Sequence, residues 1–312
     1  MNTTDTSPTT GEDLYGYVPT QSVTIIFLAL FSISTIAHAG QAITYRMWFL
    51  FPTAFLCGIF EVVGWGARLW SSISPELTTP FIIQVSGTIL GPTPLVAANF
   101  IILGRIIAYL GPIYSRLTPK QYSIVFLTGD IFSLLVQSAG GGISSSASNG
   151  GGNAALGGTI TLVGMAFQMT MITLYVLSGA EFFIRYFKKA PVRKLPRVSQ
   201  PGAPPHVRGY MDKHLRRMCI ALVFSTTCLF TRAVYRAIEL ADGWDGRIAK
   251  TQLYFNLLDG MLIVFAMYTL NVAHPGYLLD DAKREGGGKY TNTNSMELER
   301  GVRDTESMRP LA

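Results

Sequence analysis

Apolar residues gather into seven long runs along the chain, separated by short polar segments. The runs cover about residues 22–42, 48–70, 80–109, 121–142, 156–186, 215–238 and 252–273. All of them reach the roughly 20 residues that an α-helix needs to cross the hydrocarbon core of a bilayer. The pattern therefore predicts an all-α, polytopic membrane protein whose seven transmembrane helices form one membrane domain, residues 21–277.

Composition agrees with the hydrophobic pattern. Charged residues make up 14% of the 312 residues, whereas soluble domains average about a quarter. Cys57, Cys219 and Cys228 all lie inside apolar runs, so we expect buried small side chains rather than a disulfide or metal framework. The first 20 residues are polar and lack a basic region, so the first span itself is expected to act as the targeting signal.

Basic residues indicate which side of the membrane each loop occupies. Residues 1–20 contain no Lys or Arg, whereas residues 188–217 contain nine of them against one Asp. By the positive-inside rule the N-terminal segment, residues 1–20, is predicted to be extracellular and the C-terminus cytosolic. A glycosylation sequon at Asn2 agrees with this orientation.

Two cytosolic segments are predicted to lie outside the helical bundle. The basic, Pro-rich loop 188–214 is expected to be extended and to contact anionic inner-leaflet lipid. Its basic residues flank spans and have no aromatic platform beside them, so nucleic-acid binding is not expected. The tail, residues 278–312, is polar and Gly-rich and is expected to be disordered.

A glycine-rich stretch without charges joins the fourth and fifth runs. Residues 137–159 hold eight glycines, but Gly157-Gly158-Thr159 lacks the lysine that a phosphate-binding loop requires. We therefore expect an outer loop, with residues 140–142 ending the fourth helix. This loop is interpreted either as a flexible linker or as a mobile lid.

Polar residues recur at helical spacing inside the spans. Asp130, Ser133 and Gln137 lie at i, i+3 and i+7, which is one face of a helix. A charge within a span is costly and usually faces a partner or a wet cavity. In the predicted orientation most such residues collect in the outer half of the membrane, as an ion-pair network, a polar pocket open to the outer leaflet, or both. The candidate substrate-binding residues are Glu61, Arg68, Gln84, Asp130, Ser133, Gln137, Gln168, Arg232, Arg236, Glu239 and Asp259.

Several short motifs follow one another across residues 20–277. They are Glu61-x-x-Gly64-Trp65-x-x-Arg68, Gly91-Pro92-x-Pro94-x-x-Ala97-Ala98, Asp130-x-x-Ser133-x-x-x-Gln137 before Gly140-Gly141-Gly142, Gly164-x-x-x-Gln168, Arg232-x-x-Tyr235-Arg236-x-x-Glu239, and Asp259 followed by His274-Pro275-Gly276. In this order and spacing the chain resembles the fungal lipid-translocating exporters, the RTA-like seven-span proteins. It departs from them at Gln252, where the family often has Glu, and at Asn256, where it often has Tyr.

The resemblance implies a multi-pass protein of the fungal plasma membrane that moves amphipathic lipids such as sphingoid bases, or that confers resistance to membrane-active toxicants. A cationic amphiphile in the outer leaflet would suit acids such as Glu61, Asp130 and Asp259. The sequence contains no nucleotide-binding domain, so we do not expect direct ATP-driven pumping.

Three other functions are weighed against lipid transport. A seven-span lipid receptor is the first, although the third and seventh spans lack the usual G-protein-coupled switch motifs. A zinc-dependent lipid hydrolase is the second, but zinc catalysis typically needs about three protein ligands, and only His38 and His274 lie near the spans' inner ends. Porphyrin or haem handling, known from some relatives, is the third. We therefore predict a non-enzyme without metal or cofactor.

Overall fold

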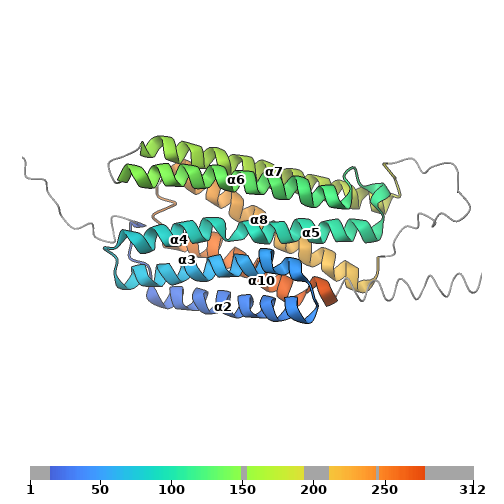
Figure 1. Cartoon of the computed structure of the whole chain (residues 1–312), viewed down its shortest axis with the longest axis horizontal. Coiled ribbons are helices and arrows are strands. Elements are labelled where there is room, and N and C mark those ends of the chain that lie inside the picture. The colour runs from blue at the N-terminus through green and yellow to red at the C-terminus, as the bar shows by residue number, and fades with distance from the viewer. Residues whose placement is uncertain (1–14, 149–152, 193–210, 244–245, 278–312) are drawn as a thin grey trace, which may run out of the picture.

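The computed structural model describes residues 15–148, 153–192, 211–243 and 246–277, and these residues form helices and no β-strand. The long helices lie side by side in one elongated bundle (Figure 1). Their bounds are α2 (Gln21–Thr44), α3 (Leu56–Ile73), α4 (Thr78–Leu90), α5 (Pro92–Leu110), α6 (Pro119–Ser148), α7 (Ala154–Lys188), α8 (Lys213–Asp242), α9 (Gln252–Tyr254) and α10 (Leu262–Val272). Short 3₁₀ turns η1 (Trp48–Leu50) and η3 (Pro112–Tyr114) and π-helical turns η2 (Phe51–Phe55) and η4 (Phe255–Met261) join them.

Within the part of the chain that the structure describes, seven helical segments are long and apolar enough to cross a membrane, which confirms the predicted all-α class and number of spans. Three of them are composite. The second runs from η1 through η2 into α3, the third joins α4 to α5, and the seventh joins α9, η4 and α10. Because the number of spans is odd, the start of α2 and the end of α10 lie at opposite ends of the bundle (Figure 1).

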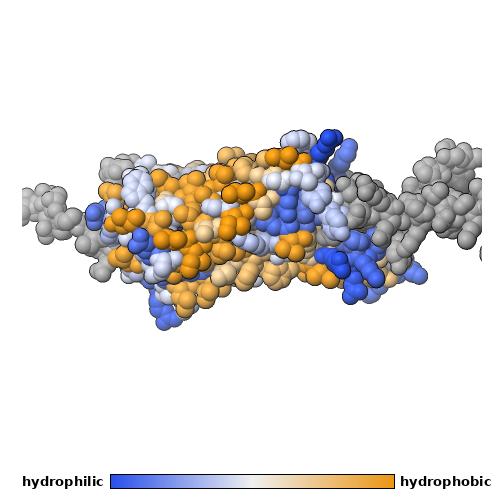
Figure 2. Space-filling view, turned by 90° about the horizontal axis from the view of Figure 1, so that it is seen from below, coloured by the Kyte–Doolittle hydropathy of each residue, from blue (hydrophilic) through white to orange (hydrophobic). Residues whose placement is uncertain are grey.

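The distribution of polarity is the reverse of that in a soluble helical bundle. Apolar side chains such as Ile36, Leu135 and Val163 are exposed on the outside, while acidic residues such as Glu61 and Asp259 are fully buried. Figure 2 shows the result on one face, with hydrophobic residues covering the middle and hydrophilic ones concentrated towards the two ends. This surface suits a bilayer, in which the lipid tails rather than water surround the helices.

The prediction that the glycine-rich stretch forms an outer loop is wrong for most of its length. Helix α6 does not end at residues 140–142 but continues to Ser148, so most of the expected outer loop is helix. The glycines instead allow α6 and α7, the most extensively packed pair, to approach closely. A Cβ at Gly140 would lie 2.7 Å from Gly157 O, and one at Gly164 would lie 3.0 Å from Gln137 N. Small residues serve the same purpose between many membrane helices.

Several predictions concern segments outside the described residues. They are the Asn2 sequon with most of the N-terminal segment, the centre of the glycine-rich stretch (residues 149–152), most of the basic loop (residues 193–210), and the tail (residues 278–312).

Candidate functional site

The break between α4 and α5 leaves a backbone carbonyl without its usual partner. In a continuous helix the N–H of residue 92 would donate to the carbonyl of Thr88, but Pro92 has no N–H. The guanidinium of Arg232 on α8 fills this vacancy, because its Nη2 donates to Thr88 O. The Gly-Pro motif thus creates an acceptor that holds an arginine of another span.

The π-helical turn η4 holds the acid that pairs with the arginines of α8. Asp259 is fully buried in this turn. Its carboxylate accepts two hydrogen bonds from Arg236, of 2.8 Å from Nε and 3.0 Å from Nη2, while Arg232 Nε lies 2.7 Å from Asp259 Oδ1. Such two-point guanidinium–carboxylate contacts are among the stronger polar interactions in proteins. π-Helical turns are rare and often occur at functional sites.

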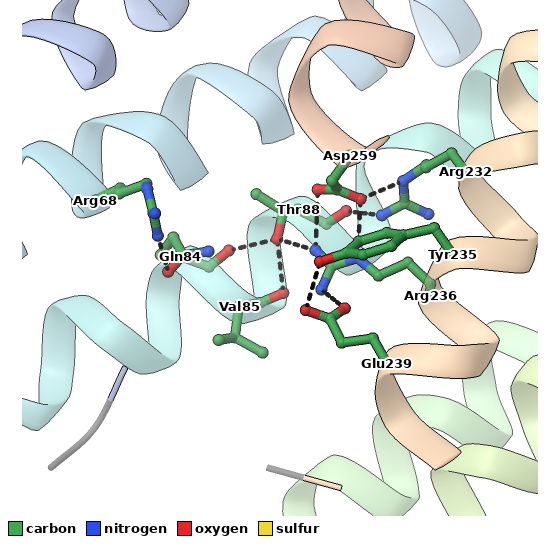
Figure 3. A network of polar contacts seen from close by, with 9 residues as sticks. All are labelled: Arg68, Gln84, Val85, Thr88, Arg232, Tyr235, Arg236, Glu239 and Asp259. Carbon is green, nitrogen blue, oxygen red and sulfur yellow. Dashed lines mark hydrogen bonds and ion pairs between the residues drawn. The ribbon is translucent and has the colours of Figure 1, made fainter. Parts of the chain in front are cut away.

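Two further groups complete the network around Arg236, as Figure 3 shows. Glu239, one turn further along α8, accepts a 2.8 Å hydrogen bond from Arg236 Nη1 and a 3.0 Å hydrogen bond from the hydroxyl of Tyr235. On the other side, Arg236 Nη2 donates to the Thr88 hydroxyl at 2.9 Å. Two arginines therefore face two carboxylates, so the charges within this network balance. We call Thr88, Arg232, Arg236, Glu239 and Asp259 the arginine cluster.

Asp130 is not part of the arginine cluster. Among the described residues it makes no ion pair, so it does not join Arg232 or Arg236 in the ion-pair network. Its Oδ1 accepts a 2.9 Å hydrogen bond from Gln168 Nε2. Its Oδ2 is buried and has no hydrogen-bond partner in the described part of the chain. The residue is 2% exposed. Asp130 is thus a buried acid with one unused oxygen.

A chain of amide side chains orients this acid. Gln137 Nε2 donates to Gln168 Oε1 at 3.0 Å, and Gln168 Nε2 in turn donates to Asp130 and, at 3.1 Å, to the hydroxyl of Thr93. These contacts join α6, α7 and the start of α5. Because both polar ends of the Gln168 amide are engaged, Oδ1 of Asp130 is held in place while Oδ2 is left unbound.

A small cavity of about 30 Å³ lies between Asp130 and the two arginines. One wall comes from α6 and α7, with Asp130, Gln137 and Gln168 beside Met165, Met169 and Ile172. The opposite wall comes from α4, α5 and α8 and includes Ile89, Thr93, Arg232 and Arg236. A volume of this size holds one or two water-sized groups, and its lining mixes apolar with charged side chains. Five of the predicted site residues therefore meet at one cavity: Asp130, Gln137, Gln168, Arg232 and Arg236.

The other predicted site residues lie elsewhere. Arg68 donates a 2.9 Å hydrogen bond from Nη2 to the Tyr17 hydroxyl, and its Nη1 lies 3.5 Å from Oε1 of Gln84. The guanidinium carbon of Arg68 lies 4.5 Å from the centre of the Phe255 ring. Ser133 is buried and donates only to the backbone oxygen of Asp130, at 2.6 Å.

Glu61 is buried near Arg232, Arg236 and Asp259 but does not line the cavity. Glu239 and Asp259 belong to the arginine cluster and do not line the cavity either.

Residues just before the first span close the end of the bundle near Arg68. Tyr15 is buried, donates a 3.0 Å hydrogen bond to Ser71 Oγ, and packs edge-on against Phe81. Burial raises the pKa of its hydroxyl above the ordinary value, so the group remains a donor. Together with Tyr17 it covers the guanidinium of Arg68.

The sequence patterns missed Thr88 and Thr93. Both are buried hydroxyl residues that contact the predicted charged and amide side chains. A signal for Thr88 was present, since it lies four residues before Pro92, where a helix carbonyl loses its partner. No comparable signal marks Thr93.

No metal centre is evident among the described residues. Nowhere in them do three or more His, Cys, Asp or Glu side chains gather closely enough to share an ion. All three cysteines are buried and unpaired. His38 and His274 are buried near one end of α2 and just beyond α10, away from the cavity lining.

Comparisons with known proteins agree on one family. A family model described as "RTA1 like protein" matches residues 54–282. The sphingoid long-chain base transporter RSB1 of Saccharomyces cerevisiae is 27% identical over 84% of this chain and 73% of its own. Protein RTA1 of the same yeast is 27% identical over 85% of this chain and 86% of its own. A lipid-translocating exporter-like protein of Leptosphaeria maculans is 25% identical over 84% of this chain and 51% of its own. No solved structure matches the chain.

Proposed function

The chain belongs to the RTA1-like family, and from this membership we propose that it moves amphipathic lipids of the sphingoid-base class across its membrane and thereby contributes to toxicant resistance. The relatives that carry transporter or exporter names support this proposal. The observation that carries it in this chain is the unbound oxygen of Asp130 in a cavity with both apolar and charged walls.

The cavity suits the headgroup of a sphingoid base better than its tail. Because Arg232 and Arg236 are neutralised by Asp259 and Glu239, Asp130 is the acid in the cavity lining that is left to attract a cation. An ammonium group is close in size to a water molecule and fits a space of about 30 Å³. The ammonium donates to Asp130 Oδ2 in this proposal, and the long apolar tail extends between the helices into the lipid.

We further propose the plasma membrane as the location, with residues 1–20 outside and the basic loop and tail in the cytosol. The charge asymmetry of the loops supports this orientation. In it, the arginine cluster lies in the outer half of the membrane, because Arg236 and Glu239 are near the outward end of α8. A basic loop at the inner surface attracts anionic lipid.

Flux of a fluorescent sphingoid base through proteoliposomes that contain the purified full chain tests the proposal. Asp130→Asn is expected to keep the melting temperature, because Asp130 makes no ion pair with any described residue. A hydrogen bond to a charged group contributes about 1.5–3 kcal/mol, so the apparent affinity for the base should fall about 10- to 100-fold. Asp242→Asn, at an exposed acid near the end of α8, is the matched control.

Three outcomes would contradict parts of this proposal. Binding of the base by the native protein without flux would favour a lipid receptor over a transporter. Flux of the base at the native rate through Asp130→Asn would remove Asp130 from the site. Equal flux of an uncharged amphiphile of the same chain length would show that the headgroup charge is not recognised.

A further inference from the structure

Glu61 is a buried acid that neither lines the cavity nor belongs to the arginine cluster. It lies on α3 and is fully buried, with neither carboxyl oxygen hydrogen-bonded to any described residue. Oε1 packs against Gly91 at the break between α4 and α5, where a side chain would occupy the same space. It therefore occupies a dry, closely fitted position. The indole N–H of Trp65, one turn further along α3, is the side-chain donor that acts on Glu61, but it makes no hydrogen bond with any described residue.

The charges around Glu61 are already balanced without it. The charged and titratable groups that act on it are Cys57 on its own helix, Arg232 and Arg236 from α8, and Asp259 from η4. Helices α2, α4 and α5 also pack against α3, but none of their described titratable residues acts on Glu61. Because the two arginines are matched by Asp259 and Glu239, a carboxylate at Glu61 would be an uncompensated charge.

An uncompensated charge in this environment has an unfavourable free energy of burial. Burying an ionised carboxylate that has no ion pair, no hydrogen bond and no contact with a cavity costs far more than burying a neutral acid, so such a group holds its proton instead. Asp130 differs, because it accepts a hydrogen bond from Gln168 and lines the cavity. Within a membrane bundle, acids of this kind commonly take part in proton relays. The geometry thus indicates that Glu61 is protonated in the conformation described here.

Arg232 is the residue that could change this state. It reaches Asp259 through one nitrogen, whereas Arg236 reaches the same carboxylate through two. If Arg232 leaves, Asp259 keeps its two hydrogen bonds from Arg236. Arg232 also lines the cavity that contains Asp130. A cation that enters the cavity therefore repels Arg232 and favours its movement towards Glu61.

We propose that Glu61 is a proton-binding site that exchanges its proton for the positive charge of the lipid headgroup. When the headgroup binds beside Asp130, Arg232 moves from Asp259 to Glu61, and the Glu61 O–H bond breaks with release of the proton. One positive charge enters and one leaves, so the charge of the bundle interior is conserved. The exchange rests on the proposed transport of a cationic lipid, whereas the protonation of Glu61 does not.

Infrared difference spectroscopy on the full chain in lipid nanodiscs tests the protonation by itself. A protonated carboxyl has a C=O stretching band that a carboxylate lacks. Glu61→Gln is expected to lose one such band relative to the native protein, while Asp130→Asn keeps it. Unchanged acid bands in a folded Glu61→Gln protein would overturn the proposal.

The exchange is tested on the native protein with a pH indicator in weakly buffered solution. Saturating sphingoid base should release protons and remove the Glu61 band, and an uncharged amphiphile of equal length should do neither. This measurement needs no variant and therefore decides the question even if Glu61→Gln does not fold. Binding of the base without proton release would overturn the exchange.

Flux in proteoliposomes provides the functional measurement. An imposed pH gradient should change sphingoid-base flux through the native protein, and the ratio of flux with and without the gradient should fall to unity in Glu61→Gln. A native-like ratio in a folded Glu61→Gln protein would overturn the exchange. If the native protein gives no flux at all, the proposed transport fails while the infrared result still decides the state of Glu61.

Discussion

At the scale of single residues, the placement of one acid decides which charges are paired. Asp130 and Asp259 both lie inside spans, and either could have met the arginines of α8. Asp259 forms ion pairs with both arginines, whereas Asp130 accepts a hydrogen bond from Gln168. One acid therefore pairs with the arginines of α8, and the other keeps one oxygen without a hydrogen-bond partner among the described residues.

Asp259→Asn is expected to destabilise the protein strongly. Removing one partner of a buried ion pair leaves the other charge uncompensated and typically costs about 3–5 kcal/mol. Glu239→Gln should cost less, because the Glu239 side chain is 15% exposed and Arg236 keeps its contact with Asp259. Thermal unfolding of the two detergent-solubilised variants measures both losses of stability.

A second substitution checks the cause of that loss. Arg236 keeps its contact with Glu239 in Asp259→Asn, so Arg232 is the cation left without a carboxylate. Arg232→Gln in the Asp259→Asn background removes this charge, so part of the lost stability should return. If the double variant is less stable than Asp259→Asn alone, charge imbalance is not the reason.

At the scale of elements, the irregular places in the helices are the ones that position the site. The break at Gly91-Pro92 provides the carbonyl of Thr88 for Arg232, and the π-helical turn η4 holds Asp259 beside α8. In the same turn, a Cβ at Gly260 would lie 2.5 Å from Cζ2 of Trp65. A regular helix at either place would lack these contacts.

Two adjacent glycines of α7 are expected to respond oppositely to alanine. A Cβ at Gly157 would lie 2.6 Å from the Gly140 carbonyl oxygen, so Gly157→Ala should force α6 and α7 apart at a cost of about 1–3 kcal/mol. A Cβ at Gly158 meets nothing within 4 Å, so Gly158→Ala should raise stability by up to about 1 kcal/mol through helix propensity.

Thermal unfolding of both variants compares these effects directly. Equal shifts would show that α6 and α7 are not closely packed at these glycines. The pair also tests the corrected assignment of the glycine-rich stretch, because alanine in a flexible loop would have little effect at either position.

At the scale of the whole molecule, the cavity lies where two parts of the bundle meet. Helices α6 and α7 form the most extensive helix pair and contribute Asp130, Gln137 and Gln168. The arginines lie on α8, across the cavity. A movement of the α6–α7 pair relative to α8 would therefore enlarge the cavity without breaking the arginine cluster.

The proposed orientation has a direct test in whole cells. Residues 195–205 should be protected from external protease and cut only after the cells are permeabilised, while a tag inserted after residue 5 should be accessible from outside. These expectations follow from the excess of basic residues in the 188–214 loop. Cleavage of residues 195–205 in intact cells would reverse the orientation and place the arginine cluster in the inner half.

The sequence by itself determined the seven spans, because a helix that crosses lipid needs a long apolar run that no tertiary contact can replace. It also determined which polar residues are buried, since helical spacing puts Asp130 and Gln137, or Arg232 and Arg236, on one face. Only the tertiary structure decided which of these groups meet. The choice of Asp259 for both arginines depends on a π-helical turn and on how α8 packs beside it. The course of α6 past residues 140–142 likewise depends on close packing against α7, which offsets the weak helix propensity of glycine.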